Sequence, residues 1–230
     1  MRSEERILVT LHRWTGPPVD THTYLLTDPA TREGWVIDAP YGTAHGVLRH
    51  CREHEVRLSM VFLTHGHFDH LLDVSIYVDA GIPIGMSPLD RPLLQLPQTE
   101  AYGVPYPMPK FPVSRLFGEG DRLRLGDREW VVWHMPGHAP GHLALIQPDT
   151  GLIIGGDLLF RNAYGRIDLP LADAEEMTIS LSRLLECPDS WRVLPGHGEE
   201  TTIGAERSWL GPLVVCQGGV DSSPEPRTKM

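Results

Sequence analysis

The chain has 230 residues, of which 41% are hydrophobic, and a formal net charge of −10. This length and apolar content suffice for one large hydrophobic core or, at most, two small domains. The acidic balance argues against nucleic acid as the main partner, because binding phosphates requires a basic stripe.

The amino terminus is charged and leads directly into a strand-like run at 7–11, so we expect no signal peptide and no membrane span. Three cysteines without CxxC spacing indicate neither a disulfide framework nor a thiolate metal site. We therefore expect a cytoplasmic protein without a membrane partner. Residues 1–217 are expected to form a single domain, and the polar tail at 218–230 is expected to be flexible.

In the first part of the chain, apolar runs bounded by turn residues predict strands at 7–11, 24–27, 35–37, 57–63 and 82–86. Helical spacing of apolar residues predicts two helices between them, over 43–54 and 71–80.

A dense polar motif, Thr64-His65-Gly66-His67-Phe68-Asp69-His70, directly follows the strand predicted at 57–63. Three histidines and an aspartate within six residues are difficult to explain as packing, because buried polar groups must be satisfied. Neutral imidazoles and a carboxylate suit zinc and, less exclusively, iron or manganese. His65 and His67 are two apart in an extended segment, so their side chains point to the same side. The motif therefore predicts a divalent metal site.

Residues 87–115 contain seven prolines, which rule out long regular structure. A segment of this length without a regular period is usually functional or mobile. Two interpretations stay open: a lid or pocket wall that offers Tyr102 and Tyr106 to a substrate, or a structural loop that covers a helix. If the segment is a lid, deleting 98–110 is expected to alter substrate preference and to leave metal content unchanged.

The second half has a similar plan. Strands are predicted at 121–125, 129–133, 143–147, 152–154 and 191–194. An amphipathic helix is predicted over 174–185, with Asp173 as its N-cap and Glu176 at capping-box spacing. The likeness of the two strand-rich halves suggests two sheets packed together with helices outside.

Five predicted strand ends carry a ligand-type residue in a turn marked by glycine or proline, where the backbone can approach a common point closely. These are Asp38, the motif at 65–70, His138, Asp157 and His197. Each is weak evidence alone, and their joint pattern indicates one site.

The order His-x-His-x-Asp-His, Pro-Gly-His, Gly-Gly-Asp and Pro-Gly-His-Gly resembles the metallo-β-lactamase superfamily over residues 22–210. The resemblance implies an α/β fold, a four-layer αββα sandwich of two mixed sheets with the metals at one edge. By position, it implies one metal held by His65, His67 and His138, a second held by Asp69, His70 and His197, and a bridging Asp157. Asp38 and His142 match positions that support the ligands without binding metal.

The closer resemblance is to the glyoxalase II-like branch, through Gly156-Asp157-Leu158-Leu159-Phe160, Gly165-Arg166-x-Asp168 and Thr201-Thr202-Ile203-Gly204-x-Glu206. It is to the short bacterial members, which lack the carboxy-terminal helices that grip glutathione. The sequence departs from the usual pattern around the pocket, so the substrate stays open; the departures are Leu71-Leu72, Met135, Ala139, Tyr164 and Ile167. Candidate substrate contacts are Arg166, Tyr164, Tyr102 and Tyr106. Arg166 is expected to pair with a substrate carboxylate, or alternatively to form a surface ion pair.

Two metals about 3.5–4 Å apart can share a water and lower its pKa toward neutrality, which gives a hydroxide that attacks a carbonyl carbon. Asp69 would orient the water as a catalytic residue. The expected protein is a binuclear metallo-hydrolase that cleaves a small thioester or ester, with a lactone as a further option. Two zinc ions are the first expectation for the cofactor, and iron or manganese are the alternatives.

Two other interpretations remain. A mononuclear iron dioxygenase that oxidises persulfides would use His65, His138 and Asp157 as a two-histidine, one-carboxylate triad. A non-catalytic metal-binding module is disfavoured because all seven ligand positions are intact. The oligomeric state is left open.

Overall fold

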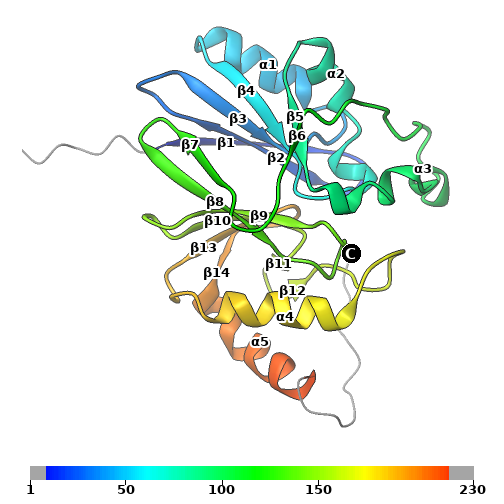
Figure 1. The fold of residues 1–230 in the computed structure, drawn as a ribbon, viewed down its shortest axis with the longest axis vertical. Helices are drawn as coiled ribbons and strands as arrows, with labels where there is room; N and C mark the ends of the chain where they lie inside the picture. The colour runs from blue at the N-terminus through cyan, green and yellow to red at the C-terminus, as the bar shows by residue number, and fades with distance from the viewer. Residues whose placement is uncertain (1–8, 218–230) are drawn as a thin grey trace, which may run out of the picture.

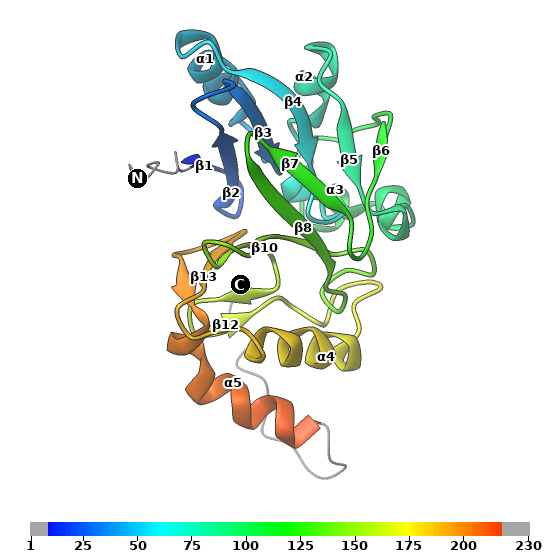
Figure 2. The same ribbon diagram turned by 60° about the vertical axis from the view of Figure 1, so that its left-hand side comes forward.

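Two six-stranded mixed sheets lie face to face, and helices cover the outer face of each (Figures 1 and 2). The computed structural model describes residues 9–217. The first sheet has the strand order β1 (Thr10–Gly16), β2 (Thr21–Thr27), β3 (Glu33–Ile37), β4 (Arg57–Phe62), β5 (Ile84–Met86) and β6 (Arg115–Leu116). The second has the order β14 (Thr201–Thr202), β13 (Arg192–Pro195), β10 (Leu152–Gly156), β9 (Leu143–Gln147), β8 (Arg128–His134) and β7 (Arg122–Leu125).

The helices are divided between the two outer faces (Figure 1). The first sheet is covered by α1 (Ala44–Glu53) and α2 (Val74–Asp79), with the short α3 (Gln98–Ala101) beside them. The second sheet is covered by α4 (Ala174–Leu185) and α5 (Ile203–Gln217). A small hairpin of β11 (Leu159–Phe160) and β12 (Ala163–Tyr164) lies between β10 and α4 in the chain. Among the helices of residues 9–217, none combines the length and apolar character needed to cross a lipid bilayer.

Three apolar layers confirm the predicted αββα sandwich. Successive strand residues point to opposite faces, so Leu26 packs between the sheets whereas Leu25 packs under α1 and α2. The layer between the sheets includes Trp35 and Trp130, whose rings meet edge to face at 6.3 Å. The third layer lies between the second sheet and its helices, with Leu181 of α4 in it. Because the central strands are buried on both faces, their sequences are continuous apolar runs.

The topology brings the carboxyl ends of several strands to one edge. β3 and β4 are parallel neighbours, and so are β10 and β13. β8 and β10 both run antiparallel to β9, so they point the same way. The segments that follow these five strands begin at residues 38, 63, 135, 157 and 196. All the ligand-type residues singled out in the sequence are in them.

The structure differs from the sequence predictions in several elements. The first strand, predicted at 7–11, is found at Thr10–Gly16, and residues 7 and 8 lie outside the described part. The helix predicted from residue 71 begins at Val74, because a 3₁₀ turn at Phe68–His70 precedes it. The predictions did not include the helices α3 and α5 or the two-residue strands β6, β11, β12 and β14. The tail at 218–230 also lies outside the described residues.

Candidate metal centre

The structure brings all seven predicted ligand residues together at this edge. Three groups have donor atoms within 4.8 Å of one another: His65, His67 and His138; His65, His70 and Asp157; and Asp69, His70 and His197. All of these side chains are buried except His197, which is half-buried. The first group is called the three-histidine group below, and the third is called the mixed group. Asp157 lies between these two groups, and together with His65 and His70 it makes up the second group.

Hydrogen bonds fix which nitrogen of each imidazole faces the centre. The Thr64 hydroxyl donates to Asp38 Oδ2 at 2.8 Å, so it accepts from His65 Nδ1 at 3.0 Å. Because the proton is on Nδ1, His65 Nε2 carries a lone pair directed into the site. A supporting acceptor on the outer nitrogen is the usual arrangement around histidine ligands of metals.

Three other histidines are oriented in the same way. The Nδ1 atoms of His70, His138 and His197 lie 2.8, 2.8 and 3.0 Å from Asp38 Oδ2, Arg166 O and Val19 O, respectively. Each Nε2 therefore faces the carboxylates. His67 instead directs Nδ1 inward, 2.8 Å from His138 Nε2.

The two inner carboxylates lie among these nitrogens. Asp157 Oδ2 is 3.4 Å from His138 Nε2 and 3.3 Å from His197 Nε2, and its Oδ1 is 3.3 Å from His70 Nε2. Asp69 Oδ2 lies 3.3 Å from His197 Nε2 and 3.4 Å from His70 Nε2. One carboxylate thus spans both groups, as a ligand shared by two cations would.

Buried ligand atoms that lack a hydrogen-bond partner test whether these residues fit metal ions. Within residues 9–217, His65 Nε2, His70 Nε2 and Asp157 Oδ1 are buried and have no hydrogen-bond partner. An unsatisfied buried polar group costs about 1–3 kcal/mol. Imidazole nitrogens and carboxylate oxygens that converge on one buried point are the ligands that zinc, iron and manganese bind. The donor set fits such cations.

Burial keeps the three-histidine group neutral. Desolvation, helped by the neighbouring imidazoles, holds the pKa of His65 well below 6.5 and lowers the pKa of His67 to about 3. Burial also lowers the pKa of His138. A neutral imidazole is the form that binds a metal, so this group is ready for a cation at neutral pH.

The mixed group is charged instead. Burial opposes protonation of His197, but Asp157 and Asp69 raise its pKa to about 10. The same carboxylates, together with Asp38, outweigh burial and hold the pKa of His70 well above 6.5. Conversely, burial is outweighed at Asp69 and Asp157, whose pKa values are lowered by His70 and His197.

Asp38 and His142 touch the ligands from outside. Asp38 has a φ of 61°, a left-handed conformation that aspartate tolerates, and its Oδ1 accepts from Thr64 N at 2.7 Å. It therefore holds both Thr64 and His70. His142 is fully buried, and its Nε2 accepts from the backbone N–H of Asp157 at 3.0 Å.

Four supporting side chains were missed in the sequence. The Thr21 hydroxyl donates to Asp69 Oδ2 at 2.7 Å, and His22 Nε2 lies 2.6 Å from Gly198 O in the His197 loop. The loops that carry the ligands, residues 63–70 and 135–142, are called the ligand loops. Asp90 and Gln98 accept hydrogen bonds from backbone N–H groups of these loops. Isolated polar residues have no periodic signature; the only hint was a run of polar residues, Thr21 to Thr23, inside a strand that proves to be wholly buried.

The four candidate substrate contacts are in different surroundings. Arg166 forms two hydrogen bonds of 2.8 Å with Asp168, and contact with the Tyr102 hydroxyl contributes to its raised pKa. The Tyr102 ring stacks on Phe68 of the ligand loop at 5.3 Å. Tyr102 and Arg166 therefore meet beside the metal centre.

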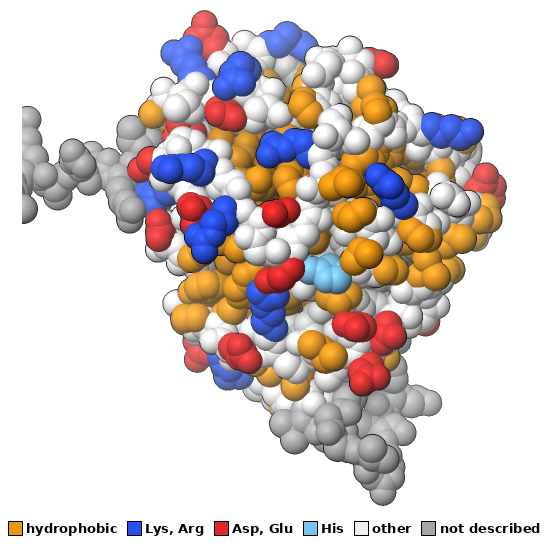
Figure 3. Space-filling view, viewed as in Figure 1, with side chains coloured by type: hydrophobic (Ala, Val, Ile, Leu, Met, Phe, Trp, Pro, Cys, Tyr) orange, Lys and Arg blue, Asp and Glu red, His pale blue; other side chains and the backbone are white. Residues whose placement is uncertain are grey.

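The other two candidates lie against different partners. Tyr106 stacks on Tyr41 at 4.3 Å, and Tyr164 packs on Trp209 of α5 at 6.3 Å. Hydrophobic side chains gather on the side of the molecule that carries β5, β6 and α3 (Figure 3). Exposed large hydrophobic residues in this part of the chain are Leu89, Tyr102, Tyr106 and Leu116.

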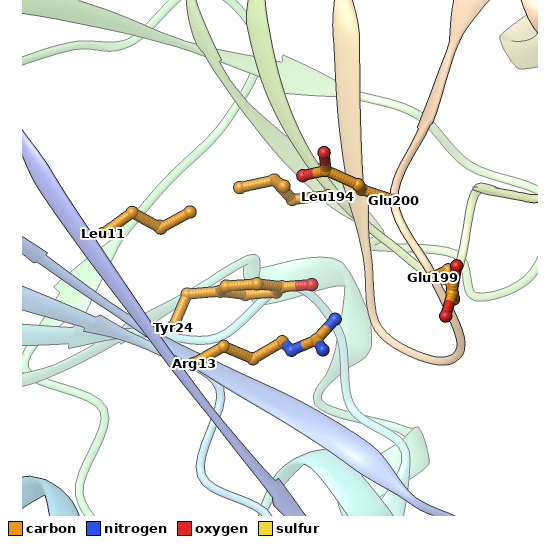
Figure 4. Close-up of a pocket in the computed structure, with 6 residues that line it drawn as sticks. All are labelled: Leu11, Arg13, Tyr24, Leu194, Glu199 and Glu200. Carbon is orange, nitrogen blue, oxygen red and sulfur yellow. The ribbon is translucent and has the colours of Figure 1, made fainter.

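A separate cavity of about 300 Å³ opens between the two sheets behind the His197 loop (Figure 4). Its lining residues are Leu11, Arg13, Tyr24, Leu194, Glu199 and Glu200. The Tyr24 hydroxyl donates to Pro195 O at 2.7 Å, two residues before His197. Both glutamates already have arginine partners, Arg161 for Glu199 and Arg192 for Glu200. The seven donors are not among the lining residues, so this cavity is distinct from the metal centre.

Comparisons with known proteins agree with this geometry. A family model described as the metallo-beta-lactamase superfamily matches residues 16–197. Hydroxyacylglutathione hydrolase GloC of Haemophilus influenzae is 34% identical over 178 residues, which cover 75% of this chain and 83% of that protein. An uncharacterized protein of Aquifex aeolicus is 35% identical, covering 84% and 91% of the two chains.

Solved structures give the same assignment. The crystal structure of TTHA1623 in a di-iron-bound form is 36% identical with a TM-score of 0.77, and covers 88% of this chain and 99% of its own. BLEG-1 B3 metallo-beta-lactamase is 28% identical with a TM-score of 0.78, covering 89% and 99%. By its sequence, its αββα sandwich and its cluster of histidines and aspartates, this chain belongs to the metallo-β-lactamase superfamily.

Proposed function

We propose that the protein is a binuclear metallo-hydrolase that cleaves a small thioester or ester. The observation that carries the proposal is the pair of donor groups around Asp157: three neutral imidazoles on one side and Asp69, His70 and His197 on the other. A single cation would need only one of these groups. Two complete groups that share a carboxylate favour two cations.

Two relatives support the chemistry. GloC, at 34% identity, is named a hydroxyacylglutathione hydrolase, which is a thioesterase activity. The relative at 36% identity was solved in a di-iron-bound form, which supports the proposal of two metals and makes iron a candidate here. We propose zinc as the first candidate, because histidine nitrogen and carboxylate oxygen are its common ligands.

When bound, a pair of divalent ions supplies hydroxide near neutral pH and a Lewis acid for the carbonyl oxygen of the substrate. The protein's own residues hold the reacting groups in position. Asp69 accepts from the Thr21 hydroxyl and would stay ionised beside a bound cation, so it can accept a hydrogen bond and orient a water rather than store a proton. Burial of the surrounding side chains limits the access of other water molecules.

We propose that Tyr102 and Arg166 contact the substrate at the rim. Their contact joins the segment 87–115 to the loop after β12, beside Phe68 of the ligand loop. Arg166 is half-buried and already paired with Asp168, so a substrate carboxylate would have to compete with that ion pair. This predicts a contribution to substrate affinity that decreases as salt increases.

Metal analysis with activity assays tests the proposal. The protein is purified without chelator and assayed with a hydroxyacyl glutathione thioester, an aryl ester and a lactone. About two equivalents of metal together with thioester or ester turnover is the expected result. One iron with oxygen consumption on glutathione persulfide would overturn it in favour of the dioxygenase. Metal binding without turnover in any assay would favour a non-catalytic module.

A further inference from the structure

Two side chains from the proline-rich segment reach the ligand loop from outside the metal centre. We propose that Asp90 and Gln98 are positioning residues, which fix the ligand loops so that His65, His67 and His138 converge on one cation. The inference rests on the metal centre of the proposed function but not on the reaction catalysed there. Both residues are buried, with exposed fractions of 0% and 9%.

Asp90 connects the two loops that supply the three-histidine group. Its Oδ2 accepts from Gly66 N at 2.8 Å, and its Oδ1 accepts from Gly141 N at 2.5 Å. Gly66 stands between His65 and His67, and Gly141 is three residues after His138. One carboxylate thus sets the distance between segments that are 75 residues apart in the chain.

Gln98, the first residue of α3, holds the same ligand loop at two further points. Its Oε1 accepts from Phe68 N at 3.1 Å, and its Nε2 donates to Gly66 O at 3.0 Å. The second amide proton goes to Leu93 O at 2.7 Å, which ties the contact to the segment's own backbone. Together with Asp90, it satisfies both polar backbone groups of Gly66.

This arrangement leaves no room for a side chain at Gly141 and little room for one at Gly66. A Cβ at Gly141 would lie 2.8 Å from the Cγ, Oδ1 and N atoms of Asp90. A Cβ at Gly66 would lie 3.1 Å from the Cβ atoms of Asp90 and Leu93. The loops therefore approach the segment as closely as a backbone can, and the side chains of Asp90 and Gln98 replace the water that would otherwise solvate them.

A carboxylate is an expensive group to bury here. Burial raises the pKa of Asp90 to about 6, although the hydrogen bonds from Gly141 N and Gly66 N and the nearby His134 act in the opposite direction. An amide would be cheaper to bury, but it presents one acceptor rather than two. Two N–H groups on separate loops need an acceptor at each end of the side chain, which only a carboxylate supplies.

This role changes what is expected of the segment 87–115. A deletion of 98–110 would remove Gln98, so metal content is expected to fall, contrary to the expectation from sequence. Tyr102 and Tyr106 can be removed without this effect, because neither forms the hydrogen bonds of Gln98 to Gly66 and Phe68. The part through Gln98 is thus a support for the ligands, and a test of a lid must begin after it.

Asp90→Asn and Gln98→Glu test the proposal, because each keeps the shape of the side chain. The first removes one hydrogen-bond acceptor, and the second removes two hydrogen-bond donors. Asp121→Asn and Gln147→Glu are matched controls: Asp121 accepts from Gly118 N at 2.9 Å, and Gln147 accepts from Thr150 N at 2.7 Å, both in turns outside the ligand loops. Metal-free proteins are titrated with zinc and with cobalt(II) against a chromophoric chelator. Thermal unfolding of each metal-free protein is measured in parallel.

We expect Asp90→Asn and Gln98→Glu to weaken binding of one of the two cations about 10-fold or more, as loss of a supporting partner does at other metal sites. The other cation and both controls should stay within about twofold of wild type, and the cobalt spectrum of the weakened site should change. Should Asp90→Asn fail to fold, Gln98→Glu decides the matter.

Wild-type affinity for both cations in the two variants would overturn the inference and leave the proposed function standing. Equal weakening of both cations, in step with lower stability of the metal-free protein, would also overturn it, because it would indicate a general structural role. A wild-type protein that binds no divalent metal would reject the inference and the proposed function together.

Discussion

Loading the metal-free protein with zinc should release protons from one half of the centre and not from the other. The mixed group holds His197, whose pKa is raised to about 10 by Asp157 and Asp69, and His70, whose pKa lies well above 6.5. The three-histidine group is neutral, since burial lowers its pKa values. A cation can take an imidazole nitrogen only after the proton leaves it.

The number of protons released follows from these pKa values. At pH 8, a group with a pKa of about 10 is about 99% protonated, whereas an ordinary histidine at 6.5 is about 3% protonated. Filling the three-histidine group should therefore release almost no proton. Filling the mixed group should release at least about one, from His197, and His70 adds to it because its pKa is also raised. Apparent affinity at the mixed group should rise about 10-fold or more per pH unit between pH 7 and 9.

The same shift has an effect on the stability of the metal-free protein. The pKa of His197 is raised above its unfolded value of 6.5, so its ion pairs stabilise the fold fully below pH 6.5. That stabilisation is lost as the pH rises through about 10. The thermal unfolding temperature of the metal-free protein should therefore decrease as the pH rises from 6.5 to about 10. Zinc should reverse this trend.

Isothermal titration calorimetry in buffers of different ionisation enthalpy counts the released protons. His197→Ala is the matched variant, because it should lower the count by one and leave binding at the three-histidine group intact. A count near zero for wild type at pH 8 would refute the charge assignment. So would an unchanged count in His197→Ala.

Three further predictions concern the site and the core. His67→Ala and Asp157→Ala should each abolish turnover with an unchanged circular dichroism spectrum, because each removes a metal donor; near wild-type rates in either would reject the ligand assignment. Arg166→Ala should raise KM for a substrate with a carboxylate more than it lowers kcat, and an unchanged KM would assign Arg166 to its ion pair with Asp168. Trp130→Ala removes a fully buried ring between the sheets and should cost about 3–5 kcal/mol in denaturant unfolding, with metal stoichiometry retained. A loss below about 1 kcal/mol would contradict the packing described for that layer.

Elements buried on one or two faces were predictable, because burial imposes a period on the sequence. The strand β9 is apolar from Leu143 to Ile146, and β4 is apolar from Met60 to Phe62. The helix α4 has an apolar stripe and an Asp173 cap that accepts from Glu175 N and Glu176 N. α5 was missed because Gly204, Gly211 and Pro212 lie inside it. Its packing on α4 and the second sheet, through Ile203 and Leu210, outweighs these poor local propensities.

Only the metal-ligating residues of the site could be predicted from the sequence. Histidines and aspartates at strand ends are conspicuous because they are costly there without a ligand, and the resemblance to a known family ordered them. Thr21, Asp90 and Gln98 could not be found in this way. Each is one polar residue in an irregular stretch or an edge hairpin. Its partner lies far away in the chain: the Asp69 carboxylate for Thr21, and backbone atoms of Gly66 for Asp90 and Gln98.

An anomalous-diffraction crystal structure of the zinc-loaded protein tests the central claim most directly, namely that the donor groups hold two cations. Two anomalous peaks are predicted about 3.5–4 Å apart, one about 2.0–2.2 Å from nitrogens of His65, His67 and His138 and the other from atoms of Asp69, His70 and His197, with Asp157 between them. A single peak, or peaks away from these side chains, would contradict the claim.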